Sequence, residues 1–272
     1  MPGKRVFSLL LLTALVAGPW CPPVVDGEQT GFTVPRTAPL YQAPPWEYRD
    51  NRAIVIVFET TPDILTELVP EPLVPHALNY AFAYIGRYNL ESPSKLTYHE
   101  AGIGIPSSYE TTQGKFAAFI YSDKVMPLAA GREIWGSPKK DAVIQFKEDG
   151  KRVTATVSRG GRAVMRATLS KDRKLDPKMG WPEAPWFSLK LVPSVEKDAR
   201  PAVMQITSTT VRDRFKELYA GKATLEFDST PDDPLGKMKV LGLVSAQFAV
   251  YDFDIGYGEI LHDYLAEAER RR

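Results

Sequence analysis

Residues 153–169, VTATVSRGGRAVMRATL, join two segments rich in apolar and β-branched side chains through a short turn. Arg159-Gly160-Gly161 lies between the segments 153–157 and 163–169. Glycine adopts the positive φ angles that tight hairpin turns require, and β-branched residues favour strands. This stretch therefore predicts an antiparallel β-hairpin.

Short apolar segments of the same kind recur along the chain and predict further strands. They are residues 53–58, 78–85, 115–122, 187–192, 203–211, 223–227 and 244–252. Helical signals are few: Thr61-Pro62-Asp63 begins a short helix that ends before Pro70, and residues 259–271 carry the one long helical pattern. We therefore predict a mainly β (α+β) fold, in which antiparallel sheets form a closed or cone-like β-barrel with a few short helices and a C-terminal helix.

The N-terminal region has the pattern of an export signal. Lys4 and Arg5 precede an apolar run over residues 6–17, which is shorter than the roughly 20 residues of a membrane span. We predict a signal peptide over residues 1–27 and an exported protein, periplasmic or secreted; an uncleaved signal would instead anchor it in a membrane. Residues 28–50, with four prolines, predict an arm, and residues 51–272 a single β domain.

Composition argues against several classes of site. The net charge is +1, and the one run of like charge is Arg270-Arg271-Arg272, so we expect no nucleic-acid groove. His76, His99 and His262 lack the spacing of zinc ligands. Gly102-Ile103-Gly104 lacks the third glycine of a dinucleotide-binding motif. We therefore predict neither a catalytic metal nor a cofactor.

Ser137-Pro138-Lys139-Lys140 is the segment whose residue types could support covalent chemistry. Adjacent lysines usually form a solvated surface. A lysine amine attacks a carbonyl group only when it is neutral, and either burial in an apolar cavity or a neighbouring cation favours the neutral form. Because neighbouring side chains of an extended chain point to opposite faces, only one of Lys139 and Lys140 can enter a cavity. We therefore expect burial to be the larger effect.

The same segment resembles a known family signature. Gly131-Arg132-Glu133 followed by Ser137-Pro138-Lys139-Lys140 resembles the acetoacetate decarboxylases, in which Gly-Arg-Glu leads into Pro-Lys-Lys. The resemblance extends over about residues 46–266 and includes Asn51-Arg52, Val69-Pro70-Glu71-Pro72-Leu73, Tyr98-His99-Glu100 and Asp263-Tyr264-Leu265. The acetoacetate decarboxylases are themselves a standard example of an activated lysine, so this mechanism comes with the resemblance.

The resemblance implies roles for several residues. Lys139 would attack the ketone of the substrate, and Lys140 would be its modulating neighbour. Arg52 and Glu100 would lie in the active cavity and handle the substrate carboxylate and its departure.

Two further residues, Glu133 and Trp135, are expected to support the lysine segment and substrate binding. The sequence also departs from the family pattern at two positions. Ala83 stands where we align a second glutamate of the family, and Ser137 stands where an aromatic residue often precedes Pro-Lys-Lys. We expect both changes to touch the pocket and to affect the choice of substrate.

These features predict a carbon–carbon lyase that decarboxylates a small β-keto acid, such as acetoacetate, through a Schiff base on a lysine. The resemblance also implies a homo-oligomer. Two alternatives stay open: an aldolase or dehydratase that uses the same lysine, and an exported protein that binds a small ligand in a β-cavity without catalysis.

Overall fold

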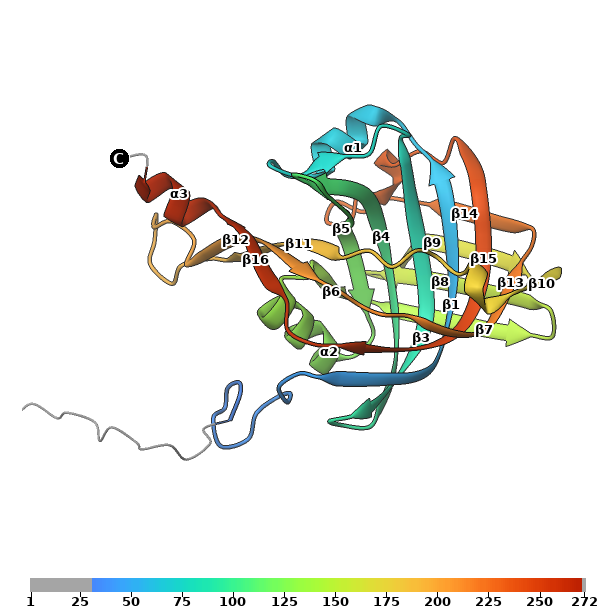
Figure 1. The fold of residues 1–272 in the computed structure, drawn as a ribbon, viewed down its shortest axis with the longest axis horizontal. Coiled ribbons are helices and arrows are strands. Elements are labelled where there is room, and N and C mark those ends of the chain that lie inside the picture. The colour runs from blue at the N-terminus through green and yellow to red at the C-terminus, as the bar shows by residue number, and fades with distance from the viewer. Residues whose placement is uncertain (1–30, 271–272) are drawn as a thin grey trace, which may run out of the picture.

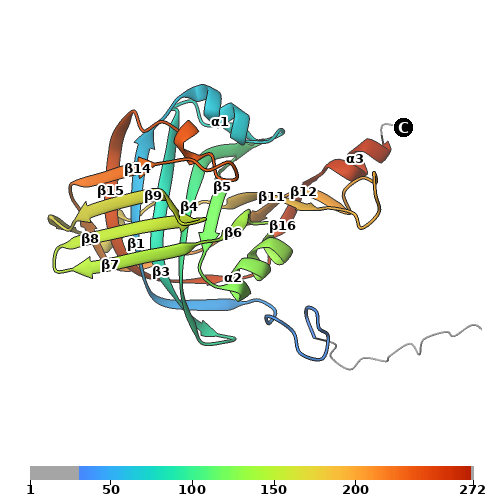
Figure 2. The ribbon, with the colours of Figure 1, turned by 180° about the vertical axis from the view of Figure 1, so that it is seen from behind.

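Two β-sheets packed face to face make up most of the computed structural model, which describes residues 31–270 (Figure 1). The large sheet follows the spatial order β10-β13-β15-β1-β3-β4-β5-β11-β12-β16, with β2 paired to β4 and β6 paired to β5. The small sheet has the order β14-β9-β8-β7. In Figure 2 the strands of the small sheet run across those of β1, β3 and β4 behind them.

The strands of the large sheet differ widely in length. In chain order they are β1 (Trp46–Glu59), β2 (Val74–Pro75), β3 (Tyr80–Ser92), β4 (Leu96–Tyr109), β5 (Thr112–Ser122), β6 (Lys139–Asp141), β10 (Arg173–Leu175), β11 (Trp186–Val192), β12 (Val203–Thr209), β13 (Arg214–Ala220), β15 (Gly242–Ile255) and β16 (Glu259–Asp263). The small sheet contains β7 (Val143–Asp149), β8 (Arg152–Arg159), β9 (Arg162–Ser170) and β14 (Ala223–Phe227). The predicted hairpin is confirmed, since β8 and β9 pair in antiparallel register around Gly160 and Gly161, both at positive φ.

The mainly β fold is confirmed, but a closed barrel is not. The strand order of the large sheet has two ends, β10 and β16, and over residues 31–270 no pairing joins them. Most neighbouring pairs are antiparallel, while β5 pairs in parallel with both β6 and β11. These parallel pairs matter for the site, because they set the position of β6 beside β5.

The helical elements are short. They are α1 (Pro62–Leu68), α2 (Val125–Ala130), a π-helical turn η1 (Gly131–Trp135), the single turns η2 (Pro177–Met179) and η3 (Leu235–Lys237), and α3 (Tyr264–Arg270). The helix start at Thr61-Pro62 is confirmed. The prediction of one helix over residues 259–271 is wrong at its beginning, because residues 259–263 pair with β12 as β16. The open edge of β12 supplies hydrogen-bonding groups that override the local helical pattern.

The N-terminal prediction can be compared only in part. The expected signal over residues 1–27 lies outside the described residues, so export stays a prediction. Residues 31–45 carry no helix or strand, but β1 begins at Trp46 and takes up the last residues of the expected arm. Within residues 31–270, the helices are too short or too polar to cross a bilayer.

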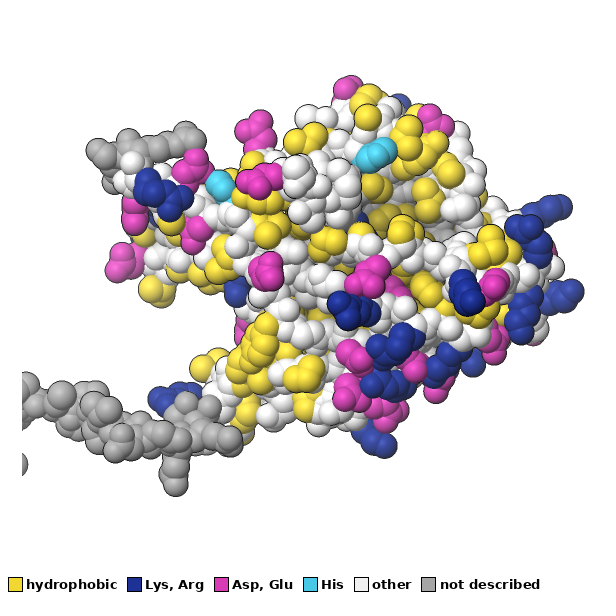
Figure 3. Space-filling view, viewed as in Figure 1, with side chains coloured by type: hydrophobic (Ala, Val, Ile, Leu, Met, Phe, Trp, Pro, Cys, Tyr) yellow, Lys and Arg dark blue, Asp and Glu magenta, His cyan; other side chains and the backbone are white. Residues whose placement is uncertain are grey.

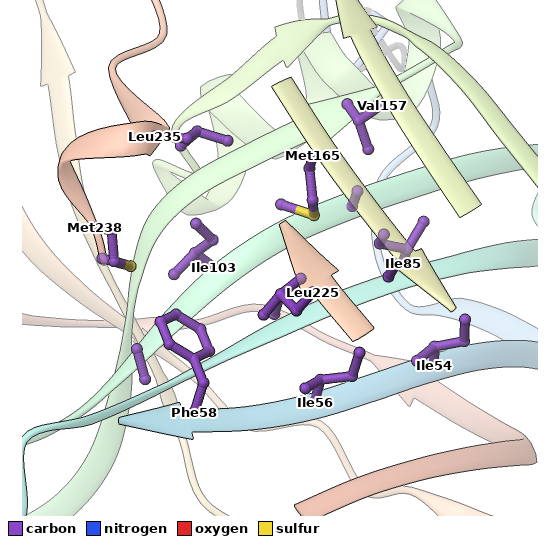
Figure 4. Close-up of a cluster of buried hydrophobic side chains, with 14 of the residues drawn as sticks. Ile54, Ile56, Phe58, Ile85, Ile103, Val157, Met165, Leu225, Leu235 and Met238 are labelled. Carbon is purple, nitrogen blue, oxygen red and sulfur yellow. The ribbon is translucent and has the colours of Figure 1, made fainter. Parts of the chain in front are cut away.

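The main hydrophobic core fills the space between the two sheets. Figure 4 shows Ile54, Ile56 and Phe58 of β1 on one side, with Met165 of β9 and Leu225 of β14 on the other. From Ile54 to Phe58 every second residue of β1 points into this core, as the alternation of a strand requires. The opposite face of the large sheet therefore remains free to line a cavity.

The face of the molecule in Figure 3 carries acidic and basic side chains together. Lys and Arg gather over the end where β7, β10 and β13 lie, and Asp and Glu are interspersed among them. No extended basic stripe appears on this face.

Phe58→Ala should lower the free energy of unfolding by about 3–5 kcal/mol, because a fully buried ring in the core would leave a cavity. Leu243 lies beside Phe58 in the β1–β15 register but is exposed, so Leu243→Ala should change stability by no more than about 0.5 kcal/mol. Chemical denaturation measures both. Equal losses would show that this core does not hold the sheets together.

Candidate active site

A cavity of about 380 Å³ lies on the face of the large sheet away from the small sheet. Most of the side chains that line it are aromatic or aliphatic, contributed by β1, β3, β5, β15 and the segment 181–188. Four acidic or basic side chains are among its lining residues: Glu100, Lys115, Lys139 and Asp213. The cavity thus combines an apolar wall with a few polar groups, the usual composition of a small-molecule site.

The local backbone brings Lys139 to this cavity. The helix α2 continues into η1, whose end is marked by Gly136 at φ 74°. A side chain at Gly136 would be strained by this φ and would meet the Cβ atom of Lys190 at 2.5 Å. After Ser137 and Pro138 the chain enters β6, where Lys139 pairs with Ile120 of β5.

Lys139 and Glu100 form a close pair inside the cavity. The Lys139 Nζ atom donates to Glu100 Oε2 at 2.6 Å, and the two side chains are 11% and 12% exposed. The Tyr84 hydroxyl donates to the other oxygen of Glu100 at 3.1 Å. An amine, a carboxyl group and a phenol are therefore linked in one chain of hydrogen bonds at the cavity wall.

Gly131 gives the Lys139 side chain the room to reach Glu100. A Cβ atom at Gly131 would lie 2.6 Å from both Cδ and Cε of Lys139 and 3.1 Å from Nζ. Arg132 holds the same segment from outside, since its Nη1 donates to the Lys139 carbonyl at 3.1 Å. The glycine and arginine of the Gly-Arg-Glu motif thus both act on the position of Lys139.

Lys140 points to the opposite face of β6, as its extended position predicted. Its Nζ contacts Asp233 Oδ1 at 3.1 Å and the carbonyl of Asp232. Asp233 is 1% exposed and also accepts from Arg159 Nε at 3.0 Å and from Tyr121 at 3.0 Å. The Lys140 charge is therefore compensated by a buried carboxylate outside the cavity.

Arg52 is not brought to the cavity, so its expected placement there is wrong. Its Nη1 atom contacts both oxygens of Glu148 on β7, at 3.1 and 3.2 Å. Arg52 lies on the same side of β1 as Ile54 and Ile56, which point toward the small sheet. Strand alternation thus separates Arg52 from Glu100.

Glu133 and Trp135 have different positions. Glu133 is exposed and accepts hydrogen bonds from Tyr41 and, at 3.3 Å, from Thr33, so it ties the N-terminal segment to the turn before Lys139. Trp135 lines the cavity, and its indole donates to the Gly256 carbonyl at 2.8 Å. Only Trp135 of this pair can touch a ligand in the cavity.

Of the two residues that depart from the family pattern, Ser137 and Ala83, only one lies at the cavity. Ser137 lines the cavity, as expected. Ala83 does not, because it lies in the core between the sheets, and the neighbouring Tyr84 faces Glu100 instead. The expectation that Ala83 touches the pocket is therefore wrong, because alternation along β3 directs Ala83 to the core and the next residue, Tyr84, to the cavity.

Several cavity residues were missed by the sequence analysis. Tyr48, Tyr88, Tyr98 and Tyr251 also line the cavity near the Tyr84–Glu100 pair, one from each of β1, β3, β4 and β15. Tyr84 and Tyr88 are four residues apart on β3, and this even spacing is a signal that could have found Tyr88. Burial, with the nearby Glu100 charge as a further cause, raises the pKa of each tyrosine, so these phenols stay protonated. Tyr84 therefore acts as a hydrogen-bond donor to Glu100.

The cavity also contains two further charged side chains, Lys115 and Asp213, that the sequence analysis did not single out. Burial lowers the pKa of Lys115, while the negative charges of Asp213 and Glu183 oppose that shift. Burial raises the pKa of Asp213, which accepts a hydrogen bond from the Trp181 indole. In residues 31–270 no three His, Cys, Asp or Glu side chains group as metal ligands would.

Asp233→Ala should lower the free energy of unfolding by about 3 kcal/mol, because it leaves Lys140 and Arg159 without their buried partner. Burial raises the pKa of Asp233, but hydrogen bonds from Arg159, Lys140 and Tyr121 outweigh it and hold the pKa below its ordinary value. The stabilisation is therefore present above about pH 4 and is lost as the pH falls through the lowered pKa.

Unfolding measured from neutral to acidic pH should show the variant and the unaltered protein converging in stability as the pH falls. Asp232→Ala is the matched control, since Asp232 is exposed and contacts Lys140 through its carbonyl. A stability difference that does not change with pH would contradict the assigned charge on Asp233.

Known proteins similar to this chain identify its family. The pattern of the acetoacetate decarboxylase (ADC) family matches residues 33–265. An acetoacetate decarboxylase of Burkholderia cenocepacia (strain HI2424) is 31% identical over 248 residues, which cover 89% of this chain and 98% of that protein.

Two solved structures are similar in fold. The crystal structure of acetoacetate decarboxylase from Legionella pneumophila superposes with a TM-score of 0.78 at 26% identity, covering 90% of this chain and 99% of that one. The enduracididine biosynthesis enzyme MppR, solved in complex with pyruvate, has a TM-score of 0.76 at 20% identity and covers 88% and 100%, which shows a shared fold. With the family pattern matched over most of its length and the Lys139–Glu100 pair in the cavity, this chain belongs to the acetoacetate decarboxylase family.

Proposed function

We propose that this protein decarboxylates a small β-keto acid through a Schiff base on Lys139. The observation that carries the proposal is the Lys139 amine, held 2.6 Å from Glu100 in a largely apolar cavity. Membership of the acetoacetate decarboxylase family supports the same chemistry.

The close pair provides a route to a neutral amine. Glu100 can accept the proton of the Lys139 ammonium along their hydrogen bond, which leaves an amine and a carboxylic acid. The amine attacks the ketone carbon, the carbonyl oxygen takes up protons and leaves as water, and a protonated imine forms.

Loss of carbon dioxide follows from the electronics of the imine. The electrons of the bond to the carboxylate move into the protonated imine, so that carbon dioxide leaves and a neutral enamine remains. The step removes one negative and one positive charge, and an apolar cavity favours such charge neutralisation. Protonation of the enamine carbon and hydrolysis then release the ketone and restore the Lys139 amine.

Glu100 is the group in position to move these protons, and Tyr84 orients it. Its second oxygen is held by the Tyr84 hydroxyl, which leaves Oε2 directed to the amine. Lys140 takes no direct part, because its charge is paired with Asp233 outside the cavity. This geometry therefore supports Glu100, and not Lys140, as the group that activates the lysine.

Incubation with acetoacetate and sodium borohydride should attach the reduced substrate carbon skeleton to Lys139, since borohydride reduces an imine to a stable amine. Intact mass and peptide mapping locate the adduct, and gas evolution measures decarboxylation. Lys139→Met should abolish both, while Lys140→Met serves as the neighbouring-lysine control and should still form the adduct.

The two readouts separate the alternatives. An adduct on Lys139 without carbon dioxide release, across a panel of β-keto acids, would favour an aldolase or dehydratase that uses the same imine. No adduct at all would leave a non-catalytic ligand-binding protein as the better account.

Gly131→Ala should reduce the rate of adduct formation by at least about tenfold, which corresponds to a barrier raised by about 1.4 kcal/mol, because the new methyl group displaces the Lys139 side chain from Glu100. Gly242→Ala is the matched control, since a Cβ atom there meets no atom within 4 Å. Thermal unfolding of both variants checks that the fold survives. Unchanged trapping in a folded Gly131→Ala variant would contradict the placement of the Lys139 amine.

A further inference from the structure

Lys115 is a second amine in the cavity, and the proposed chemistry at Lys139 does not use it. Lys115 belongs to β5 and lies beside Trp186 of β11 in the parallel register of these strands. Its Nζ atom lies 4.9 Å from the centroid of the Trp186 ring, and both side chains line the cavity.

The Lys115 amine lacks a hydrogen-bonding partner of its own. Among residues 31–270 no carboxylate lies within 4 Å of its Nζ atom, and no hydrogen bond from that atom is found. Asp213, the charge with the largest electrostatic effect on Lys115, accepts a hydrogen bond from the Trp181 indole. A partly buried cation with unused donors is costly unless a ligand supplies acceptors.

Lys115 belongs to β5 and Lys139 to the neighbouring strand β6, and the two lysines lie at different levels along β5. Lys139 pairs with Ile120 of β5, and a bulge lies between Lys115 and Ile120, whose partners on β4, Pro106 and Gly102, are four residues apart. At a rise of about 3.3 Å per residue the two levels are separated by roughly 13 Å. Both long side chains can lean toward the space between them. A group bound at Lys115 thus belongs to a molecule longer than acetoacetate when its ketone is bound to Lys139.

The cavity between the two amines is apolar. Ala117 and Ile120 of β5 line it on one side. The rings of Phe82 and Tyr84 also line the cavity and lie 5.6 and 5.8 Å from the Trp186 ring, measured between centroids. A chain of methylene groups fits such surroundings, since it loses no hydrogen bonds on burial.

We propose that the substrate is a β-keto acid whose carbon chain continues beyond the ketone and ends in a second carboxylate, which Lys115 binds. The first carboxylate, beside the ketone, is the one lost as carbon dioxide. The inference rests on the proposed function, because it takes the ketone to be bound at Lys139. It makes Lys115 the residue that selects diacids over monoacids.

The test compares 3-oxo diacids with 3-oxo monoacids of matched chain length. At the best length, kcat/KM should favour the diacid by at least about tenfold, the effect expected of one charge-assisted hydrogen bond in a cavity. Lys115→Met should reduce this preference about tenfold, mainly through KM, and Lys115→Arg should retain part of it because the charge is kept. Lys95→Met is the matched control, since Lys95 is 85% exposed and pairs with Glu91 away from the cavity.

Calorimetry with unreactive saturated diacids and monoacids separates failure of this inference from failure of the proposed function. Tighter binding of the diacid, lost in Lys115→Met, supports the carboxylate subsite even if no keto acid is decarboxylated. Decarboxylation with adduct formation on Lys139, but with no diacid preference or with the same preference in Lys115→Met, overturns the subsite and leaves the proposed function standing.

Discussion

The division of two adjacent lysines between the two faces of the short strand β6 is the constraint on which the site depends. Lys139 enters an apolar cavity and meets Glu100, while Lys140 meets the buried Asp233. Two unpaired ammonium groups side by side would repel each other, and two in one cavity would each need a counter-charge. The strand gives each amine its own carboxylate, and it can do so because β5 holds β6 in parallel register.

The two faces of the large sheet also have different roles: one stabilises the fold and the other lines the cavity. One face packs against the small sheet through aliphatic side chains, and this contact stabilises the fold. The other face carries aromatic residues around a cavity, in which burial keeps the tyrosines protonated and leaves a few charged groups exposed to a ligand. A reaction that removes charge, such as loss of carbon dioxide from a protonated imine, suits this environment better than one that creates charge.

Local sequence was a good guide where strands alternate or turns have a clear chemistry. The hairpin around Gly160 and Gly161, the start of α1 and the pair β11–β12 are examples. The strand β4 was missed because Gly102 and Gly104 weaken its strand pattern. These glycines are required by packing, since a Cβ atom at Gly104 would overlap the Phe82 ring at 2.2 Å and one at Gly102 would lie 2.7 Å from the Tyr84 ring. Such a contact joins different strands and leaves no local signal.

By itself, the sequence determined the mainly β fold, because strand periodicity is a local property. The family resemblance, which rests on local motifs, supplied the expectation that Lys139 enters the cavity with Glu100. Only the tertiary structure decided which side chains share the cavity. Arg52 lies outside the cavity and contacts Glu148. Ala83 lies in the core, while its neighbour Tyr84 contacts Glu100. Lys115 and Asp213 line the same cavity as Lys139. The physical reason is that a shift of one residue along a strand moves a side chain to the other face of the sheet, and bulges and pairing partners that set this shift lie far away in the chain.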